Sequence, residues 1–139
     1  MDNLGLDTVE APLTLYSQAD LLVFQNRFEE AFLKLDTLRS GFPKHTLEDD
    51  IYYMKSKVFY KKRDYLKSAE MLQKIVDEYP DGIRGDNALF GLGELYENHL
   101  NDVEKAKGIY EKIFTDYSGS TFAIEARKNF RRLRGDNIQ

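Results

Sequence analysis

The chain has 139 residues, a formal net charge of −4 and no cysteine. This length suits one domain with a hydrophobic core. The lack of cysteine excludes disulfides, thiolate metal sites and cysteine nucleophiles, and the acidic balance argues against a general nucleic-acid binder, whose binding domains are usually basic.

Residues 1–12 are predicted to form a flexible lead-in. They show no helical periodicity, carry three acidic residues and end at Pro12. They have neither the basic region nor the apolar region of a secretory signal. Both a complete protein and a piece of a longer one fit this start.

From residue 13 onward, apolar residues recur every three or four positions, which predicts helices, and almost no stretch alternates as a strand does. The predicted helices span residues 13–25, 28–40, 47–61, 65–79, 86–98, 102–117 and 121–134. They form three pairs, in repeats at about 13–45, 46–82 and 83–120, followed by a cap helix at 121–134 and a flexible tail at 135–139. Predicted helix-end signals are Gly41, Pro43, Thr46, Pro80 and Gly135.

The chain repeats itself with a spacing of 37 residues. Small residues recur at Ala19, Ser56 and Gly93, and a second small set follows at Ala31, Ser68 and Ala106. Small side chains let two helix axes approach to about 8 Å, so we expect these residues where the helices of a pair cross. Gly93 needs a packing reason, because glycine inside a helix costs about 1 kcal/mol relative to alanine. Self-similarity at this period predicts stacked helical units.

This pattern resembles the tetratricopeptide repeat (TPR) family. The third repeat reads Leu92-Gly93-x-x-Tyr96 and then Ala106-x-x-x-Tyr110, while the first two repeats match more weakly. The resemblance covers residues 13–134. It implies an all-α fold, a right-handed α-solenoid of three helix hairpins plus a C-terminal capping helix, and a non-enzymatic binding role without cofactors.

The spacing departs from the 34-residue period of the family. The extra residues fall in junctions that begin Phe42-Pro43, Tyr79-Pro80 and Tyr117-Ser118. Such junctions resemble those of bacterial cell-envelope repeat proteins, namely the periplasmic partner of the Tol–Pal system and the lipoprotein of the outer-membrane assembly machine. The C-terminal stretch at 125–136 resembles long Bacteroidetes repeat proteins. These resemblances imply the periplasm or cell envelope; because the chain shows no signal peptide, the cytoplasm is the alternative.

In such repeats the first helix of each hairpin lines a concave groove, so the resemblance implies a peptide-binding or protein-binding surface there. The register places Tyr16, Asp20, Val23, Asp50, Tyr53, Lys57, Tyr60, Phe90, Glu94 and Glu97 in the groove. Tyr16, Tyr53 and Phe90 share one repeated position and would form an aromatic ladder; an equally weighted alternative is that these rings only pack against the next hairpin. The acids disfavour a carboxylate ligand, and a mildly basic or aromatic peptide fits better.

A second hypothesis is a structural module that caps the C-terminal end of a longer solenoid. Terminal repeats need a polar outer face, and the last predicted helix carries on one face the basic residues Arg127, Lys128, Arg131, Arg132 and Arg134. Residues 21–24 are apolar on all sides, which predicts cover by an upstream repeat, by the lead-in or by a second copy.

No motif indicates catalysis. His45 and His99 have no partner at metal-ligand spacing and are predicted to be solvated turn residues. No carboxylate pair stands isolated in an apolar setting, and no glycine-rich phosphate loop occurs. The apolar run at 21–24 is too short to span a membrane. We therefore expect no enzyme activity, metal, cofactor, nucleic-acid partner or membrane-spanning segment.

Overall fold

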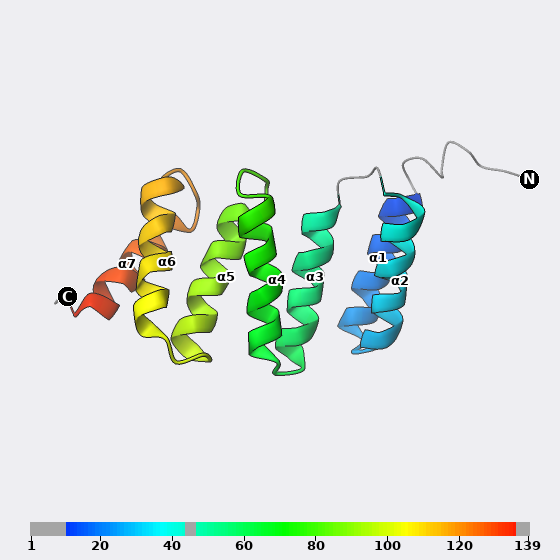
Figure 1. Cartoon of the computed structure of the whole chain (residues 1–139), viewed down its shortest axis with the longest axis horizontal. Coiled ribbons are helices and arrows are strands. Elements are labelled where there is room, and N and C mark those ends of the chain that lie inside the picture. Colours follow the sequence, from blue (N-terminus) through cyan, green and yellow to red (C-terminus); the bar gives the residue numbers. More distant parts are fainter. Residues whose placement is uncertain (1–10, 44–46, 136–139) are drawn as a thin grey trace, which may run out of the picture.

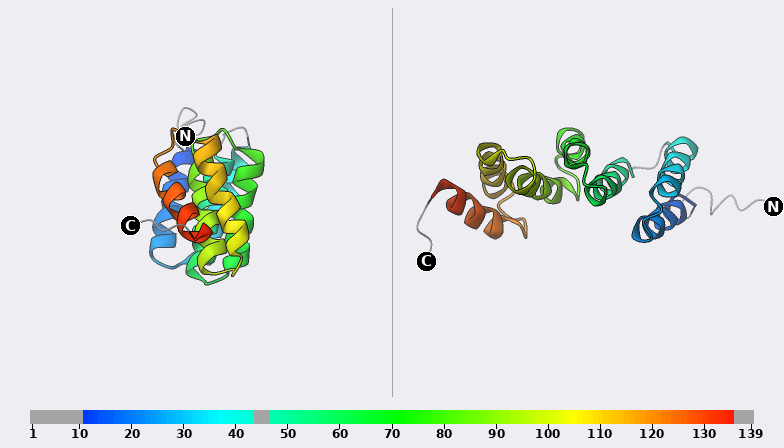
Figure 2. Two further views of the ribbon diagram at one scale, coloured as in Figure 1. Left: turned by 90° about the vertical axis from the view of Figure 1, so that its left-hand side faces the viewer. Right: turned by 90° about the horizontal axis from the view of Figure 1, so that it is seen from below.

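The computed structural model describes residues 11–43 and 47–135, which form seven α-helices and no strand. The helices are α1 (Ala11–Phe24), α2 (Phe28–Gly41), α3 (Glu48–Lys61), α4 (Tyr65–Glu78), α5 (Gly85–Asn98), α6 (Val103–Asp116) and α7 (Ala123–Arg134). They follow one another along a single long axis as antiparallel pairs (Figure 1), and the view from below shows the same order (Figure 2, right). The predicted all-α solenoid of three hairpins and a further C-terminal helix is confirmed.

The three hairpins turn in the same way. Asn26, Arg63 and Asn101 have positive φ angles of 62°, 62° and 54°, and each stands one residue before the N-cap of the second helix. Asp64 and Asp102 then cap α4 and α6, because each carboxylate accepts a backbone N–H from the first turn. The positive-φ turn therefore recurs in every hairpin, whereas the aspartate cap occurs only in the second and third, because Arg27 at the N-cap of α2 makes no side-chain cap.

The junctions between hairpins repeat as well. The C-cap residues of α2, α4 and α6 are Phe42, Tyr79 and Tyr117, with φ of −137°, −135° and −126° and ψ of 59°, 50° and 48°. The Tyr117 hydroxyl donates a hydrogen bond of 2.7 Å to the carbonyl of Pro80 in the preceding junction. The aromatic residue that ends α6 thus ties the third hairpin to the second.

All six recurring small residues are buried. In the second hairpin the Ser68 hydroxyl donates to the backbone carbonyl of Ser56 at 2.8 Å, so α3 and α4 are in contact at this point. In the third hairpin, a Cβ on Gly93 would lie 2.6 Å from Cε1 of Tyr110. The Tyr110 ring fills the space that a side chain at Gly93 would need.

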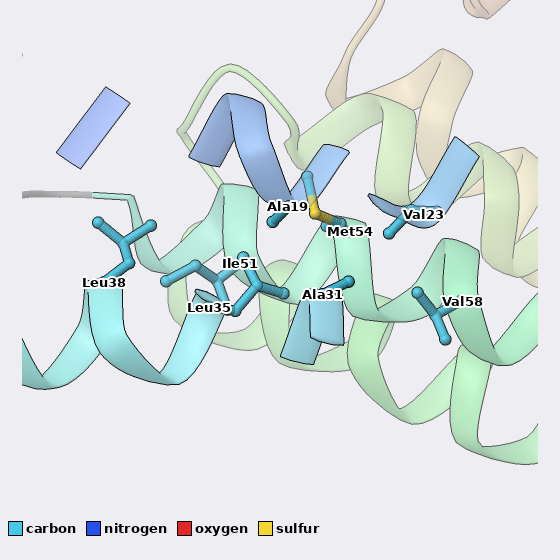
Figure 3. Packing of buried hydrophobic residues seen from close by; sticks show 8 residues of the cluster. All are labelled: Ala19, Val23, Ala31, Leu35, Leu38, Ile51, Met54 and Val58. Atoms are coloured by element: carbon cyan, nitrogen blue, oxygen red, sulfur yellow. The ribbon is translucent and has the colours of Figure 1, made fainter. Parts of the chain in front are cut away.

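The hydrophobic core is divided into three clusters, each of which joins neighbouring hairpins. The first cluster joins α1 and α2 to α3 through Ala19, Val23, Ala31, Leu35, Leu38, Ile51, Met54 and Val58, as Figure 3 shows. The second joins α4 to α5, and the third joins α5 and α6 to α7. Each hairpin is therefore stabilised by its nearest neighbours, as expected for a solenoid.

Some helix ends differ from the prediction. Ala11 and Pro12 belong to α1 rather than to the lead-in, because proline in the first turn of a helix loses no hydrogen bond. Gly41 is the last residue of α2, and Phe42 takes the C-cap position. The predicted cap Thr46 and the predicted turn residue His45 lie outside the described residues. Gly135 ends α7 with φ of 93°, as predicted.

Candidate functional site

A pocket of about 360 Å³ lies between α3 and α5. Five aromatic side chains line it, namely Tyr53 and Tyr60 from α3, Phe90 from α5, His99 from the end of α5 and Phe122 from the start of α7. The lining also has six polar residues, which are two serines, two asparagines, a lysine and a glutamate. Aromatic walls combined with polar groups that can fix the orientation of a ligand are typical of ligand sites.

The structure brings together half of the predicted groove residues. Tyr53, Lys57, Tyr60, Phe90 and Glu94 all line this pocket. Asp20 and Val23 line a more open hollow of about 480 Å³ beside α1, which shares Lys57 with the pocket. Val23 is only 3% exposed and belongs to the first core cluster, so it offers little surface to a ligand. The remaining three, Tyr16, Asp50 and Glu97, lie outside both linings and contact neighbouring helices.

The first two aromatic-ladder residues contact the next hairpin. The Tyr16 hydroxyl lies 3.4 Å from the carbonyl of Asp50, and burial raises the pKa of Tyr16 to about 12. The Tyr53 hydroxyl accepts a hydrogen bond of 3.3 Å from the Asn87 amide. Tyr16 therefore packs against the next hairpin. Tyr53 also contacts the next hairpin, and in addition it lines the pocket.

The third ring, Phe90, contacts the cap segment. It stacks on Phe122 with ring centroids 5.0 Å apart, and it also touches the buried ring of Tyr110. The repeat register does not place Phe122 in the groove, because its contact with Phe90 depends on how α7 folds back over α5 and α6. The ladder positions thus combine packing against the next unit with exposure to the pocket.

Asp50 is held by an arginine from the next junction. Arg84 donates to the Asp50 carboxylate at 2.5 Å, and its guanidinium lies 4.4 Å from the centroid of the Tyr53 ring. Both charged side chains are about one-quarter exposed. Asp50 is therefore engaged in joining α3 to the start of α5. The repeat pattern does not predict this pair, since Arg84 lies in a junction, 34 residues from Asp50.

Glu97 anchors α7. Its carboxylate accepts a hydrogen bond of 2.9 Å from the Tyr110 hydroxyl and one of 2.6 Å from Arg132. The bond from Arg132, together with that from Tyr110, lowers the pKa of Glu97 despite its burial. Glu97 is thus occupied by contacts that hold α5, α6 and α7 together.

Three charged residues share one repeated position on the first helices: Asp20, Lys57 and Glu94. Lys57 lies 3.7 Å from the Asp20 carboxylate, as an exposed ion pair. Glu94 makes no hydrogen bond or ion pair with any residue that the structure describes. Burial raises its pKa, and the nearby carboxylates of Glu97 and Glu125 raise it further. The pocket therefore contains one carboxylate whose charge is not balanced by a partner.

His99 lies in a turn, as predicted, but its ring is packed against other rings and is only partly exposed. Its ring stacks on Tyr65, with centroids 3.9 Å apart, and its Nε2 lies 3.1 Å from the Tyr60 hydroxyl. The turn from α5 to α6 has one residue more than the other two hairpin turns, which places His99 against α3 and α4. The longer spacing between Gly93 and Ala106 was the available signal.

Over the described ranges, no cluster of histidine, cysteine, aspartate or glutamate is arranged to hold a metal ion. None of the helices described here combines the length and apolar character needed to cross a bilayer.

Comparison with known families gives two matches within the chain. Residues 50–82 and 87–120 each match the model described as "Tetratricopeptide repeat". These ranges cover all but the first two residues of the second and third hairpins, whose first helices supply most of the pocket lining. The α1–α2 hairpin lies outside the matches, although its turn and junction have the same geometry. No curated protein matches the chain.

Proposed function

Because residues 50–82 and 87–120 of this chain match the tetratricopeptide repeat model, we propose that the protein is a binding scaffold whose working surface is the pocket between α3 and α5. The observation that supports this most directly is the convergence of five groove residues, predicted from the repeat register, on one aromatic pocket. Large aromatic side chains dominate binding energy at protein interfaces. The ligand is a segment of another protein, and the chain itself performs no chemistry on it.

An extended peptide fits the shape of this surface better than a compact ligand does. The pocket and the open hollow beside α1 share Lys57, so they adjoin on the face formed by the first helices. A volume of about 360 Å³ accommodates one or two side chains rather than a folded element. The peptide therefore places an anchor side chain in the pocket and runs on past Lys57 toward α1.

Site-specific photo-crosslinking tests the proposal. A photoreactive phenylalanine analogue replaces Tyr60, which is 48% exposed at the pocket, or Leu66, which is 59% exposed on α4 outside its lining. We expect a specific protein adduct from position 60 and none from position 66 when the variants are irradiated in the cells that make the protein. Adducts of equal yield from both positions, or from position 66 alone, would overturn the groove proposal.

A structural role as a C-terminal cap is the second candidate. On α7, Ala126 is buried against the third core cluster, while Arg127, Lys128 and Arg131 are exposed, which gives the polar outer face of a terminal unit. At the other end, Leu21 and Phe24 of α1 are 56% and 80% exposed. The same photoreactive residue at position 21 distinguishes the two functions: an adduct there combined with none at position 60 favours the cap.

The compartment is part of the proposal. The junctions that begin at Phe42 and Tyr79 support a place in the bacterial cell envelope, by their resemblance to periplasmic repeat proteins. Osmotic-shock fractionation of cells that express the complete gene should release the protein with periplasmic markers. Its recovery with cytoplasmic markers would contradict this location without affecting the binding role.

A further inference from the structure

The four acidic residues predicted for the groove differ in whether a lysine or arginine side chain of the protein forms an ion pair with them. Three have one: Asp20 lies near Lys57, Asp50 is bonded to Arg84, and Glu97 is bonded to Arg132. Glu94 alone of the four has no hydrogen bond or ion pair within the described residues, and it is the only one of the four that lines the α3–α5 pocket.

Glu94 is exposed, yet its surroundings disfavour its charge in the free protein. Neighbouring residues partly desolvate the carboxylate, and the carboxylates of Glu97 and Glu125 repel it. No described cation offsets these effects. A ligand that brings a positive charge to Glu94 therefore removes a repulsion and forms an ion pair, and both effects favour binding.

The pocket walls also suit a cation. Phe90 and Phe122 stack beside Glu94, while Tyr53 and Tyr60 form the α3 wall. Aromatic faces attract lysine and arginine side chains, and a planar guanidinium stacks on them especially well. Arg84 already uses the Tyr53 ring in this manner at 4.4 Å.

The lining contains one cation, Lys57, which would repel a basic ligand. Its ammonium, however, lies 3.7 Å from the Asp20 carboxylate on α1 and 5.8 Å from the centroid of the Tyr53 ring, so its charge is already partly balanced by Asp20. Lys57 belongs to α3 and Glu94 to α5. A basic side chain enters beside α5, between Glu94 and the rings.

We propose that this pocket receives an arginine or lysine side chain of the bound protein, with Glu94 as its counter-ion and the rings of Phe90, Phe122 and Tyr60 as its walls. The proposal rests on the proposed function and adds the chemistry of the anchor residue.

Selection from a random peptide library tests the binding role of the pocket and the basic anchor residue separately. Octapeptides displayed on phage are selected against the wild-type protein, against Glu94→Lys and against Glu111→Gln, a control at an exposed position of α6 outside the pocket. We expect an enriched arginine or lysine with the wild type and the control, and an enriched aspartate or glutamate with Glu94→Lys. Peptides that bind at the pocket but show no basic residue overturn the anchor and leave the scaffold role standing. Failure to select any pocket-directed peptide overturns the scaffold role itself.

Titration of the protein with one selected peptide then measures the interaction between Glu94 and the anchor side chain. Glu94→Gln, which keeps the size of the side chain, should weaken binding about threefold to tenfold, as expected for a partly exposed ion pair with aromatic contacts. Replacing the anchor arginine of the peptide with neutral citrulline should weaken it similarly. The two changes together should cost no more than either alone, because both remove one interaction. Fully additive losses would contradict a direct contact between Glu94 and the anchor.

Discussion

Replacement of Gly93 by alanine examines how the third hairpin closes. Gly93 lies in the middle of α5, and a Cβ there would stand 2.6 Å from Cε1 of Tyr110. The Tyr110 ring has little freedom to move, since it is 0% exposed and its hydroxyl is bonded to Glu97 at 2.9 Å. The new methyl group therefore forces the helices apart or displaces a buried ring.

The expected magnitude follows from two opposing effects. Alanine in place of a helical glycine stabilises by about 1 kcal/mol, while overpacking a core costs about 1–3 kcal/mol. Gly108→Ala in α6 supplies the matched control, because a Cβ there meets nothing within 4 Å. It should raise the free energy of unfolding by about 1 kcal/mol, whereas Gly93→Ala should lower it or leave it unchanged. The difference between the two variants isolates the overpacking cost.

Urea denaturation of both variants measures this difference, as a shift of the midpoint with an unchanged slope. Repeating the measurement in a Tyr110→Leu protein makes the test specific to the contact with Tyr110. In the first hairpin the corresponding pair is Ala19 and Leu35, both buried. Gly93→Ala should therefore be less harmful in a Tyr110→Leu protein than in the wild type. If Gly93→Ala stabilises the protein as much as Gly108→Ala does, the proposed contact does not limit the packing.

Other predictions concern single side chains. Arg63→Asn should stabilise the protein by roughly 0.5 kcal/mol in urea denaturation, because Asn tolerates the left-handed conformation that Arg63 adopts at φ 62°; a loss of stability would refute this. The depressed pKa of Glu97 stabilises the fold above its ordinary pKa of 4.5, and this stabilisation is lost as pH falls through the lower folded value. Arg132→Ala should therefore reduce the loss of stability that acid causes below the ordinary pKa of 4.5, and an unchanged pH profile would contradict the assigned pair. The raised pKa of Glu94 means that its charged form destabilises the fold above the ordinary pKa of 4.5. Glu94→Gln should therefore raise the melting temperature at pH 7 and have no such effect below pH 4.5. A lower melting temperature of this variant at pH 7 would contradict an unpaired charge at Glu94.

The hairpins could be predicted from the sequence because their determinants are local or strictly periodic. Ala19, Ser56 and Gly93 recur with the spacing of the repeat, and all three are buried in equivalent helices. The prolines and glycines between apolar stretches marked the helix ends to within two residues. Fold class follows from such repetition, since each unit must bury its apolar face on its neighbour.

Contacts between hairpins could not be predicted in the same way. Arg84 and Phe122 lie in junctions, and their partners, Asp50 and Phe90, are one repeat away. Which junction side chain reaches which helix depends on how far each hairpin is rotated relative to the last, and no local pattern encodes that rotation. The same applies to His99, whose place against Tyr65 follows from one additional residue in a turn.

Chemical-shift mapping with a peptide selected from the library tests the central claim most directly. The proposed groove predicts that titration shifts the backbone amide signals of Tyr53 and Lys57 in α3 and of Gly91 and Glu94 in α5, which line the pocket. Signals of α4 and α6 residues that point away from the pocket, such as Leu66 and Glu111, should remain in place. Shifts confined to those outer positions, or to the exposed end of α1 at Leu21 and Phe24, would contradict a binding site between α3 and α5.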